Sequence, residues 1–286
     1  MAFILLTISS MGLQAADLTS KSVRDYWFDG AEINRYELKQ GRYGEQHPGH
    51  AEFIFVTEPF LTDKQVKHEG GPGSSVPVLK LNALRTFNTG IYSYRTMTST
   101  FQPTDLKNHP HALKSTTSVQ DWCGQAFLQL NRRKPGWSLQ LNSYFQNEGD
   151  QNLKISEAIL EDSVWIRMRL DPKNLPQGEF KMIPGAIFTR FQHVEVKPAT
   201  AKGTLSLSKG RYHYSLNYPS LGRTLKIEAD EAFPHVIREW SESHQASGTN
   251  TTAKLTHHLT KQYYWDQKRH SDAGSRRKLG LSPTPR

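Results

Sequence analysis

The clearest structural signal in this sequence is the run Trp137-Ser138-Leu139-Gln140-Leu141-Asn142-Ser143-Tyr144. Apolar and polar residues alternate through it with a period of two, which is typical of a β-strand that buries one face. The same alternation recurs along the chain, in residues 164–170, 212–218, 225–229 and 236–240. Three further runs are strand-like in composition: the apolar residues 53–56, residues 78–81 after Pro77, and the Tyr- and Thr-rich residues 91–101.

Turn residues separate these runs. Residues 70–75 and 244–253 are rich in Gly, Ser, Thr or Asn and predict loops, and residues 134–136 and 208–211 predict tight turns, the second of them a hairpin. Helical patterns are few: residues 156–161, and residues 271–279 with Ser271 as the N-cap. We therefore expect a mainly β fold, an antiparallel curved sheet, half-barrel or sandwich with few short helices. In residues 164–170 we expect Arg167 and Arg169 on the solvent face of a strand.

Composition restricts the class of protein. The chain has 286 residues, and 36 Lys and Arg against 27 Asp and Glu give a net charge of +9. Aromatic residues are plentiful, which is typical of a folded chain. The dense basic cluster Arg276-Arg277-Lys278 is too short for a nucleic-acid footprint and has no recognition motif beside it, so we expect no nucleic-acid partner.

The N-terminus predicts export. Residues 3–11 are nearly free of strongly polar side chains, and small residues precede Asp17, a pattern typical of a signal peptide over residues 1–16. We expect one β-rich domain over residues 17–281, a frayed end over residues 282–286, no transmembrane span, and a monomer in the periplasm or otherwise outside the cytoplasm. Cys123 is the only cysteine, so no intrachain disulfide can form.

Motifs for chemistry are scarce. The twelve histidines show no metal-ligand spacing with a third ligand, and P-loop, dinucleotide and serine-hydrolase motifs are absent. We expect neither a metal nor a cofactor. The compact run Asp121-Trp122-Cys123-Gly124 offers Trp122 and Cys123 either as core residues or as a binding or nucleophilic site.

A second cluster is denser in polar groups. Arg42, Glu45 and Glu58 flank an expected hairpin, with Lys80 on a nearby run. Together with Trp27, Asp29 and Glu32 they suit either a polar site or ordinary cross-strand ion pairs. Our candidate binding residues are therefore Arg42, Glu45, Glu58, Lys80, Trp122 and Cys123, and none is assigned as catalytic.

These segments also carry a family likeness that covers most of the chain. The matching residues are 26–32, 42–45, 55–60, 77–82, 120–124 and 278–281. They resemble a group of exported proteins from Bacteroidetes and related bacteria that are often labelled "septum formation inhibitor Maf". Maf proteins themselves are cytoplasmic nucleotide pyrophosphatases with an α/β fold and a Ser-x-Ser-Pro-Arg-Arg loop, and this chain has no such run. Many members of the group carry a lipobox cysteine, which this chain also lacks.

Three functions remain open from the sequence. The first is a non-enzymatic envelope protein whose concave face holds a lipid, a hydrophobic ligand or a partner protein. The second is a periplasmic hydrolase of glycans or esters with Glu45, Glu58 or Cys123 as candidates, and the third is the nucleotide pyrophosphatase that the family label implies. Two acids within about 5–9 Å of each other in a cleft would favour the second.

Overall fold

The computed structural model describes residues 21–284, and the sixteen strands in this part of the chain form one sheet. The strand order is β10-β11-β12-β13-β14-β15-β16-β1-β2-β4-β5-β6-β7-β8-β9, with β3 paired to β2 beside this path. All neighbours are antiparallel except β10 and β11. The strands are β1 (Ala31–Arg42), β2 (Glu45–Leu61), β3 (Val66–Lys67), β4 (Ser75–Thr89), β5 (Tyr92–Pro103), β6 (Lys114–Gln120), β7 (Gln125–Arg132), β8 (Gly136–Ser143), β9 (Gln151–Ser156), β10 (Ile159–Leu160), β11 (Gly178–Ile183), β12 (Ala199–Ser208), β13 (Arg211–Tyr218), β14 (Arg223–Asp230), β15 (Ile237–His244) and β16 (Asn250–Gln262).

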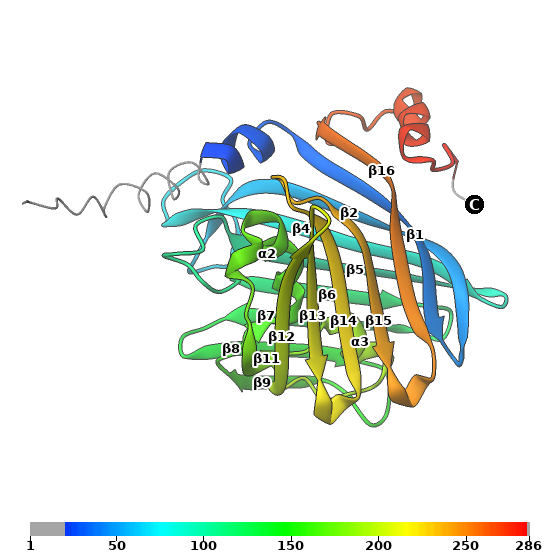
Figure 1. The fold of residues 1–286 in the computed structure, drawn as a ribbon. Helices are drawn as coiled ribbons and strands as arrows, with labels where there is room; N and C mark the ends of the chain where they lie inside the picture. Colours follow the sequence, from blue (N-terminus) through cyan, green and yellow to red (C-terminus); the bar gives the residue numbers. More distant parts are fainter. Residues whose placement is uncertain (1–20, 285–286) are drawn as a thin grey trace, which may run out of the picture.

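The order of the strands explains the curvature of the sheet. The chain enters in the middle, at β1, and runs outward through β9 to one edge. Only two residues then separate β9 from β10, which is the opposite edge strand, and β11 to β16 lead back to β1. Because the two edges are joined by so short a link, the sheet must bend until they meet, and Trp137 Nε1 donates to the Ala158 carbonyl there at 3.0 Å. The predicted antiparallel, mainly β, curved fold is confirmed (Figure 1).

Short helices fill the inside of this curved sheet. They are η1 (Glu161–Ser163), α2 (Val164–Leu170) and α3 (Ala186–Phe191), with η2 (Pro172–Asn174) after α2. Trp165 of α2 packs its ring 5.4 Å from Phe53 of β2 and 5.6 Å from Trp240 of β15. One helix residue therefore joins the aromatic side chains of both halves of the sheet.

The prediction of a half-exposed strand at residues 164–170 was wrong, because this segment is helix α2. All seven of its residues are buried, including Arg167 and Arg169. A helix that is enclosed on every side has no polar face, so its sequence lacks the 3.6-residue period. The alternation of apolar residues with arginine predicted that Arg167 and Arg169 face solvent. Instead, Arg169 pairs with a buried carboxylate, and Arg167 donates to the Asn174 side chain at 3.2 Å.

Two other predictions need correction. Residues 156–161 are not a helix: they contain the end of β9, all of β10 and the first residue of η1. The loop expected at residues 244–253 is shorter, because a 3₁₀ turn, η4 (Gln245–Ser247), leads directly to β16 at Asn250.

The hairpin turns follow from backbone chemistry. Tyr43 and Gly44 join β1 to β2 with φ of 53° and 81°, and Lys209 and Gly210 join β12 to β13 with φ of 51° and 71°. Two successive positive φ values match the twist of antiparallel strands, which is why glycine follows in both turns. The hairpin predicted at residues 208–211 is confirmed, and η3 (Pro219–Leu221) makes the turn between β13 and β14.

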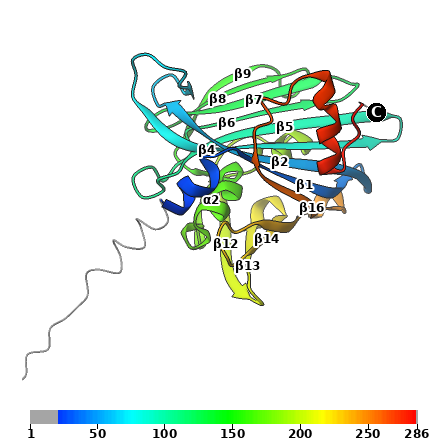
Figure 2. The same cartoon turned by 90° about the horizontal axis from the view of Figure 1, so that it is seen from above.

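The C-terminal helix lies outside the sheet. The helix predicted at residues 271–279 is the 3₁₀ helix η5 (His270–Leu279), although its N-cap is Arg269 rather than Ser271. None of its residues is buried, and Figure 2 shows it outside the sheet, away from α2. The expected signal peptide, residues 1–16, lies outside the described residues, as do residues 285 and 286 of the expected frayed end.

Candidate functional site

The candidate residues from the sequence do not form one site. Arg42 and the Trp122–Cys123 turn lie at one end of the sheet, where Arg42 and Gly124 line the same small crevice. Arg42 is half-buried: its guanidinium stacks 4.8 Å from the Phe191 ring and donates to the Phe191 carbonyl at 2.5 Å. Trp122 and Cys123 are both exposed, so neither anchors the core.

The two acids proposed for hydrolysis lie far apart. Glu45 opens β2 and is exposed, whereas Glu58 is close to the other end of the same strand. Thirteen residues of strand correspond to about 40 Å at roughly 3.3 Å per residue. Glu58 pairs with Lys80 across β2 and β4, with Nζ 2.5 Å from Oε1. These acids cannot form a glycosidase carboxylate pair, and Glu58 and Lys80 form an ordinary cross-strand ion pair, one of the two alternatives left open by the sequence.

Glu32 lies in the core and has a structural partner. Its carboxylate accepts hydrogen bonds from Arg169 of α2, Asn34 and Trp27. Burial by itself would raise the pKa of Glu32, but the charge of Arg169 and hydrogen bonds from His258, Arg169 and Asn34 outweigh it and lower the pKa to about 2. Asp29, by contrast, is exposed and bonds Lys261 at 3.1 Å.

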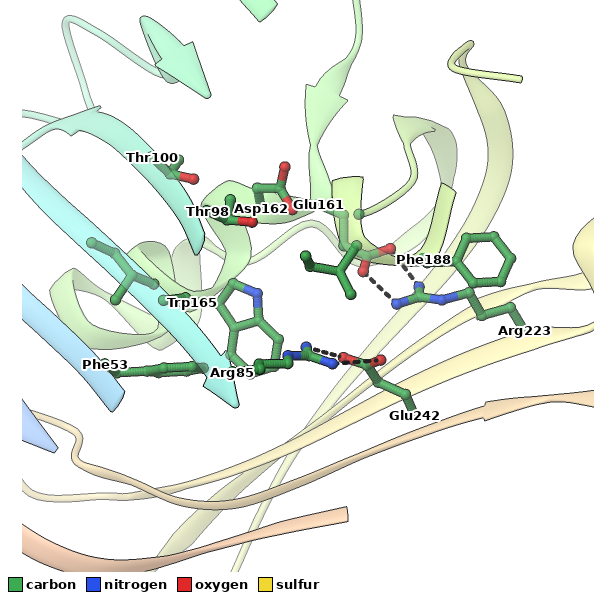
Figure 3. A pocket seen from close by; sticks show the side chains of 14 residues that line it. Phe53, Arg85, Thr98, Thr100, Glu161, Asp162, Trp165, Phe188, Arg223 and Glu242 are labelled. Atoms are coloured by element: carbon green, nitrogen blue, oxygen red, sulfur yellow. Dashed lines mark hydrogen bonds and ion pairs between the residues drawn. The ribbon is translucent and has the colours of Figure 1, made fainter. Parts of the chain in front are cut away.

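The densest polar cluster lies inside the sheet, and the sequence did not indicate it (Figure 3). Glu161 of η1 accepts two hydrogen bonds of 2.5 and 2.6 Å from Arg223 of β14. Arg85 of β4 donates to Glu242 of β15 at 2.7 Å, and both pairs face the same cavity as Asp162. The Arg85–Glu242 pair connects the two halves of the sheet directly, and the Glu161–Arg223 pair connects η1 to β14.

Asp162 is the most perturbed acid of this cluster. Burial, followed by the neighbouring charge of Glu161, raises its pKa to about 6. Its carboxylate accepts hydrogen bonds from Ser115 Oγ at 3.0 Å and from the Ala186 amide at 3.2 Å. An acid that titrates near neutral pH would suit proton transfer. The cavity, however, measures about 30 Å³, room for about two water molecules, so no substrate fits there and we assign the cluster to structure.

The concave face therefore offers no space for a ligand of lipid size. The second cavity on this side, beside Arg42, measures about 20 Å³. A much larger hollow lies on the opposite, outer face, between the sheet and the segment that follows β16. It measures about 1210 Å³, and we call it the outer groove.

Alternate residues of four adjacent strands form the floor of the outer groove. Ile33 of β1 lies opposite Ile54 of β2, and Leu84 of β4 lies opposite Met97 of β5. Leu84 is also the diagonal neighbour of Ile54, because its direct partner on β2 is Glu52. The four side chains thus form a continuous apolar strip. The roof is made by the C-terminal segment, with Tyr264, Leu279, Leu281 and Pro283.

Positive charge surrounds this apolar strip. The lining contains four arginines, Arg35, Arg95, Arg276 and Arg277, and a single carboxylate, Glu52. That carboxylate is already engaged, because Glu52 Oε1 lies 2.7 Å from His50 Nδ1 and 3.8 Å from Arg35 Nε. Arg95 is exposed and forms no ion pair with any residue in the range 21–284. The groove therefore combines an apolar floor with uncompensated cations.

The sequence missed the groove for a simple reason. Its floor residues lie on four different strands: Ile33 and Met97 stand between polar residues, whereas Ile54 belongs to the apolar run 53–56, which does not show which of its side chains face outward. Only the register between the strands places them side by side. Within the described part of the chain, no three His, Cys, Asp or Glu side chains group as metal ligands. No helix there is long and apolar enough to span a bilayer.

Comparisons with known proteins show a structural likeness but no family. No protein-family model matches the sequence, and no curated protein matches it either. Among solved structures, the chain is similar to the crystal structure of a β-barrel-like protein of the domain of unknown function DUF1849 from Brucella abortus. The TM-score is 0.49 at 6% identity, over 80% of this chain and 96% of that chain. No residue of the outer groove is assigned from this likeness.

Proposed function

We propose that this chain is a non-enzymatic binding protein that holds an amphipathic anion, an acyl chain with an acidic headgroup, in the outer groove. The observation that supports this function is the combination of room, apolar floor and excess arginine in one hollow of about 1210 Å³. Ligand pockets commonly measure roughly 300–1,000 Å³, so the groove has space for a lipid-sized molecule.

Each part of such a ligand has a matching chemistry in the groove. Methylene groups that leave water for the strip of Ile33, Ile54, Leu84 and Met97 gain about 0.8 kcal/mol each. An acidic headgroup suits guanidinium groups, which donate paired hydrogen bonds to carboxylate or phosphate oxygens. Four arginines against one engaged carboxylate favour an anion over a neutral or cationic amphiphile.

The compartment is part of the same proposal. The apolar run and small residues of positions 1–16 support export to the periplasm, where acidic amphiphiles are components of the envelope. The resemblance to exported Bacteroidetes proteins is in keeping with this location, and membership of that group stays a prediction. The nucleotide pyrophosphatase alternative gains no support from the antiparallel sheet, because that activity belongs to an α/β fold.

The test uses three probes that separate chain from headgroup. Calorimetry with lysophosphatidylglycerol, below its micelle concentration, is expected to show one-to-one binding. Lysophosphatidylcholine, with the same chain and a zwitterionic head, should bind more weakly, and glycerol phosphate, which lacks the chain, should not bind measurably.

A substitution in the floor of the outer groove tests the role of the apolar strip, and a substitution outside the groove is the matched control. Leu84→Asp places a carboxylate on the apolar strip and should abolish binding, whereas Leu207→Asp, at an exposed position on β12, should leave binding unchanged. Both variants are checked by circular dichroism for an intact fold. The proposal is wrong if lysophosphatidylglycerol does not bind, or if Leu84→Asp binds it as the unmodified protein does.

A further inference from the structure

Four turns between strands, all at the same end of the sheet, each carry a large, exposed apolar side chain. They are Tyr43 between β1 and β2, Ile91 between β4 and β5, Trp122 between β6 and β7, and Tyr144 after β8. Their exposed fractions are 60%, 85%, 70% and 53%. Because successive strands are antiparallel, these four turns are neighbours along the same end of the molecule. We call these four residues the apolar rim.

The turns that carry this rim pack against one another. The Tyr43 hydroxyl hydrogen-bonds the Tyr94 hydroxyl at 2.7 Å, and Arg42 stacks 4.4 Å from the Tyr43 ring. The Tyr144 ring lies so close to Gly124 that a Cβ at position 124 would meet it at 2.6 Å. The rim is thus a supported row of side chains that protrude from turns, and it is neither a groove nor a pocket.

The rim is continuous with the outer groove. Arg95, which lines the groove, lies four residues after Ile91 on β5. Its partner across the sheet is Gln120, which also lines the groove and precedes the turn that carries Trp122. One end of the groove therefore opens directly behind the apolar rim.

Behind the apolar rim lies Arg95, an exposed cation that forms no ion pair with any residue in the range 21–284. The Asp121 carboxylate is held inside its turn by the amides of Cys123 and Gly124, and Glu148 pairs with Arg190 at 2.8 Å. Exposed Glu45 and Asp150 balance part of the remaining charge, but the groove behind the rim contains four arginines. Protruding Trp, Tyr and Ile side chains in front of cations match the interface of an anionic bilayer, where amphipathic rings insert at the headgroup level.

We propose that the apolar rim inserts into the surface of an anionic lipid bilayer and presents the open end of the outer groove to the lipids. A protein partner would need a recess that fits four separate tips, whereas a bilayer accommodates them without a defined shape. This inference deepens the proposed function, because the bilayer is then the source or destination of the amphiphile.

The only cysteine of the chain makes the test direct. Cys123 is exposed and adjacent to Trp122, so an environment-sensitive nitrobenzoxadiazole label on its thiol reports insertion of the rim. With phosphatidylglycerol–phosphatidylcholine vesicles we expect a blue shift and a rise in fluorescence, and with pure phosphatidylcholine a much weaker response. In the Cys123→Ser/Leu207→Cys variant the label at position 207 lies at the opposite end of the sheet and should not respond.

Substitutions in the rim separate this inference from the proposed function. Ile91→Asp/Trp122→Asp removes two exposed tips, and we expect vesicle affinity to fall at least about tenfold, since interfacial binding scales with buried apolar area. Binding of monomeric lysophosphatidylglycerol by this variant should be unchanged. If vesicle binding persists in the variant, or if the labels at positions 123 and 207 respond equally, the apolar rim does not insert into the bilayer. If the protein binds vesicles through the rim but does not bind lysophosphatidylglycerol, the proposed function of the outer groove is wrong and the inference about the rim stands.

Discussion

Glu32 of β1 and Arg169 of α2 form a fully buried pair, in which each carboxylate oxygen lies 2.6 Å from one terminal nitrogen of the guanidinium. The pair joins the middle of the sheet to the helix that fills its interior, across 137 residues of sequence. Breaking such a pair from one side leaves a charge in the core without compensation. Loss of Arg169 alone should therefore destabilise the fold.

Arg169→Met should lower the free energy of unfolding by about 3–5 kcal/mol, because Glu32 then remains charged and buried without its cation. Glu32→Gln/Arg169→Met should lose less than the single variant, since the amide oxygen still accepts from Trp27 and no charge is stranded. Urea unfolding followed by tryptophan fluorescence measures both. The control is Lys197→Ala in an exposed pair with Glu195, expected to change stability by less than about 0.5 kcal/mol. Equal losses in Arg169→Met and Lys197→Ala would contradict the assigned role.

Asp162 gives the pH dependence of the fold a definite sign. Its pKa in the folded protein, about 6, lies above the ordinary value of 3.8, so its contribution is fully present below pH 3.8 and is lost as pH rises through about 6. A shift of about two units corresponds to about 3 kcal/mol. Asp162→Asn should therefore remove a decrease in stability between about pH 4 and 6 that the unmodified protein shows.

Comparison of the unmodified protein with Asp162→Asn separates the effect of Asp162 on the free energy of unfolding from that of Glu32. The contribution of Glu32 changes with pH in the opposite direction. The pKa of Glu32 is lowered to about 2, so its contribution is present above pH 4.5 and is lost as pH falls through about 2. Since both proteins keep Glu32, the difference between their pH profiles belongs to Asp162. Parallel profiles would show that Asp162 titrates normally.

Arg95 should contribute to the affinity of the outer groove through its charge. A hydrogen bond to a charged group is typically worth about 1.5–3 kcal/mol, so Arg95→Ala should weaken lysophosphatidylglycerol binding about 10- to 100-fold. It should also reduce the loss of affinity with added salt. The matched control is Lys226→Ala, an exposed cation that lines a separate hollow on the outer face of β14 to β16, which should bind as the unmodified protein does. If both variants weaken binding equally, only net charge matters.

Cys123 should react with a thiol reagent in the folded protein, because its side chain is exposed in the turn between β6 and β7. We expect one equivalent of thiol without denaturant, and the same total after unfolding. Cys123→Ser should change the unfolding free energy by less than about 0.5 kcal/mol, since nothing in the core depends on this residue. A thiol that reacts only in urea would place Cys123 in the core and contradict its exposed position beside Trp122 of the apolar rim.

The sequence by itself determined the class of the fold. Alternation in 137–144, 212–218 and 225–229, and the Gly-containing turns between strands, depend on neighbours one or two residues away, so they can be read locally. The same local logic failed at residues 164–170, where enclosure on all sides makes arginine a buried residue and removes the helical period. Whether Arg169 faces water or Glu32 depends on a contact 137 residues distant, which no local pattern contains.

Only the tertiary structure decided where binding chemistry gathers. Ile33, Ile54, Leu84 and Met97 lie on four different strands, and strand register alone makes them one surface. In the same way, the alternation of strand direction brings Tyr43, Ile91, Trp122 and Tyr144 to one end of the sheet. The physical reason is that side-chain period assigns a residue to a face, while hydrogen-bonded register across strands decides which residues of that face are neighbours.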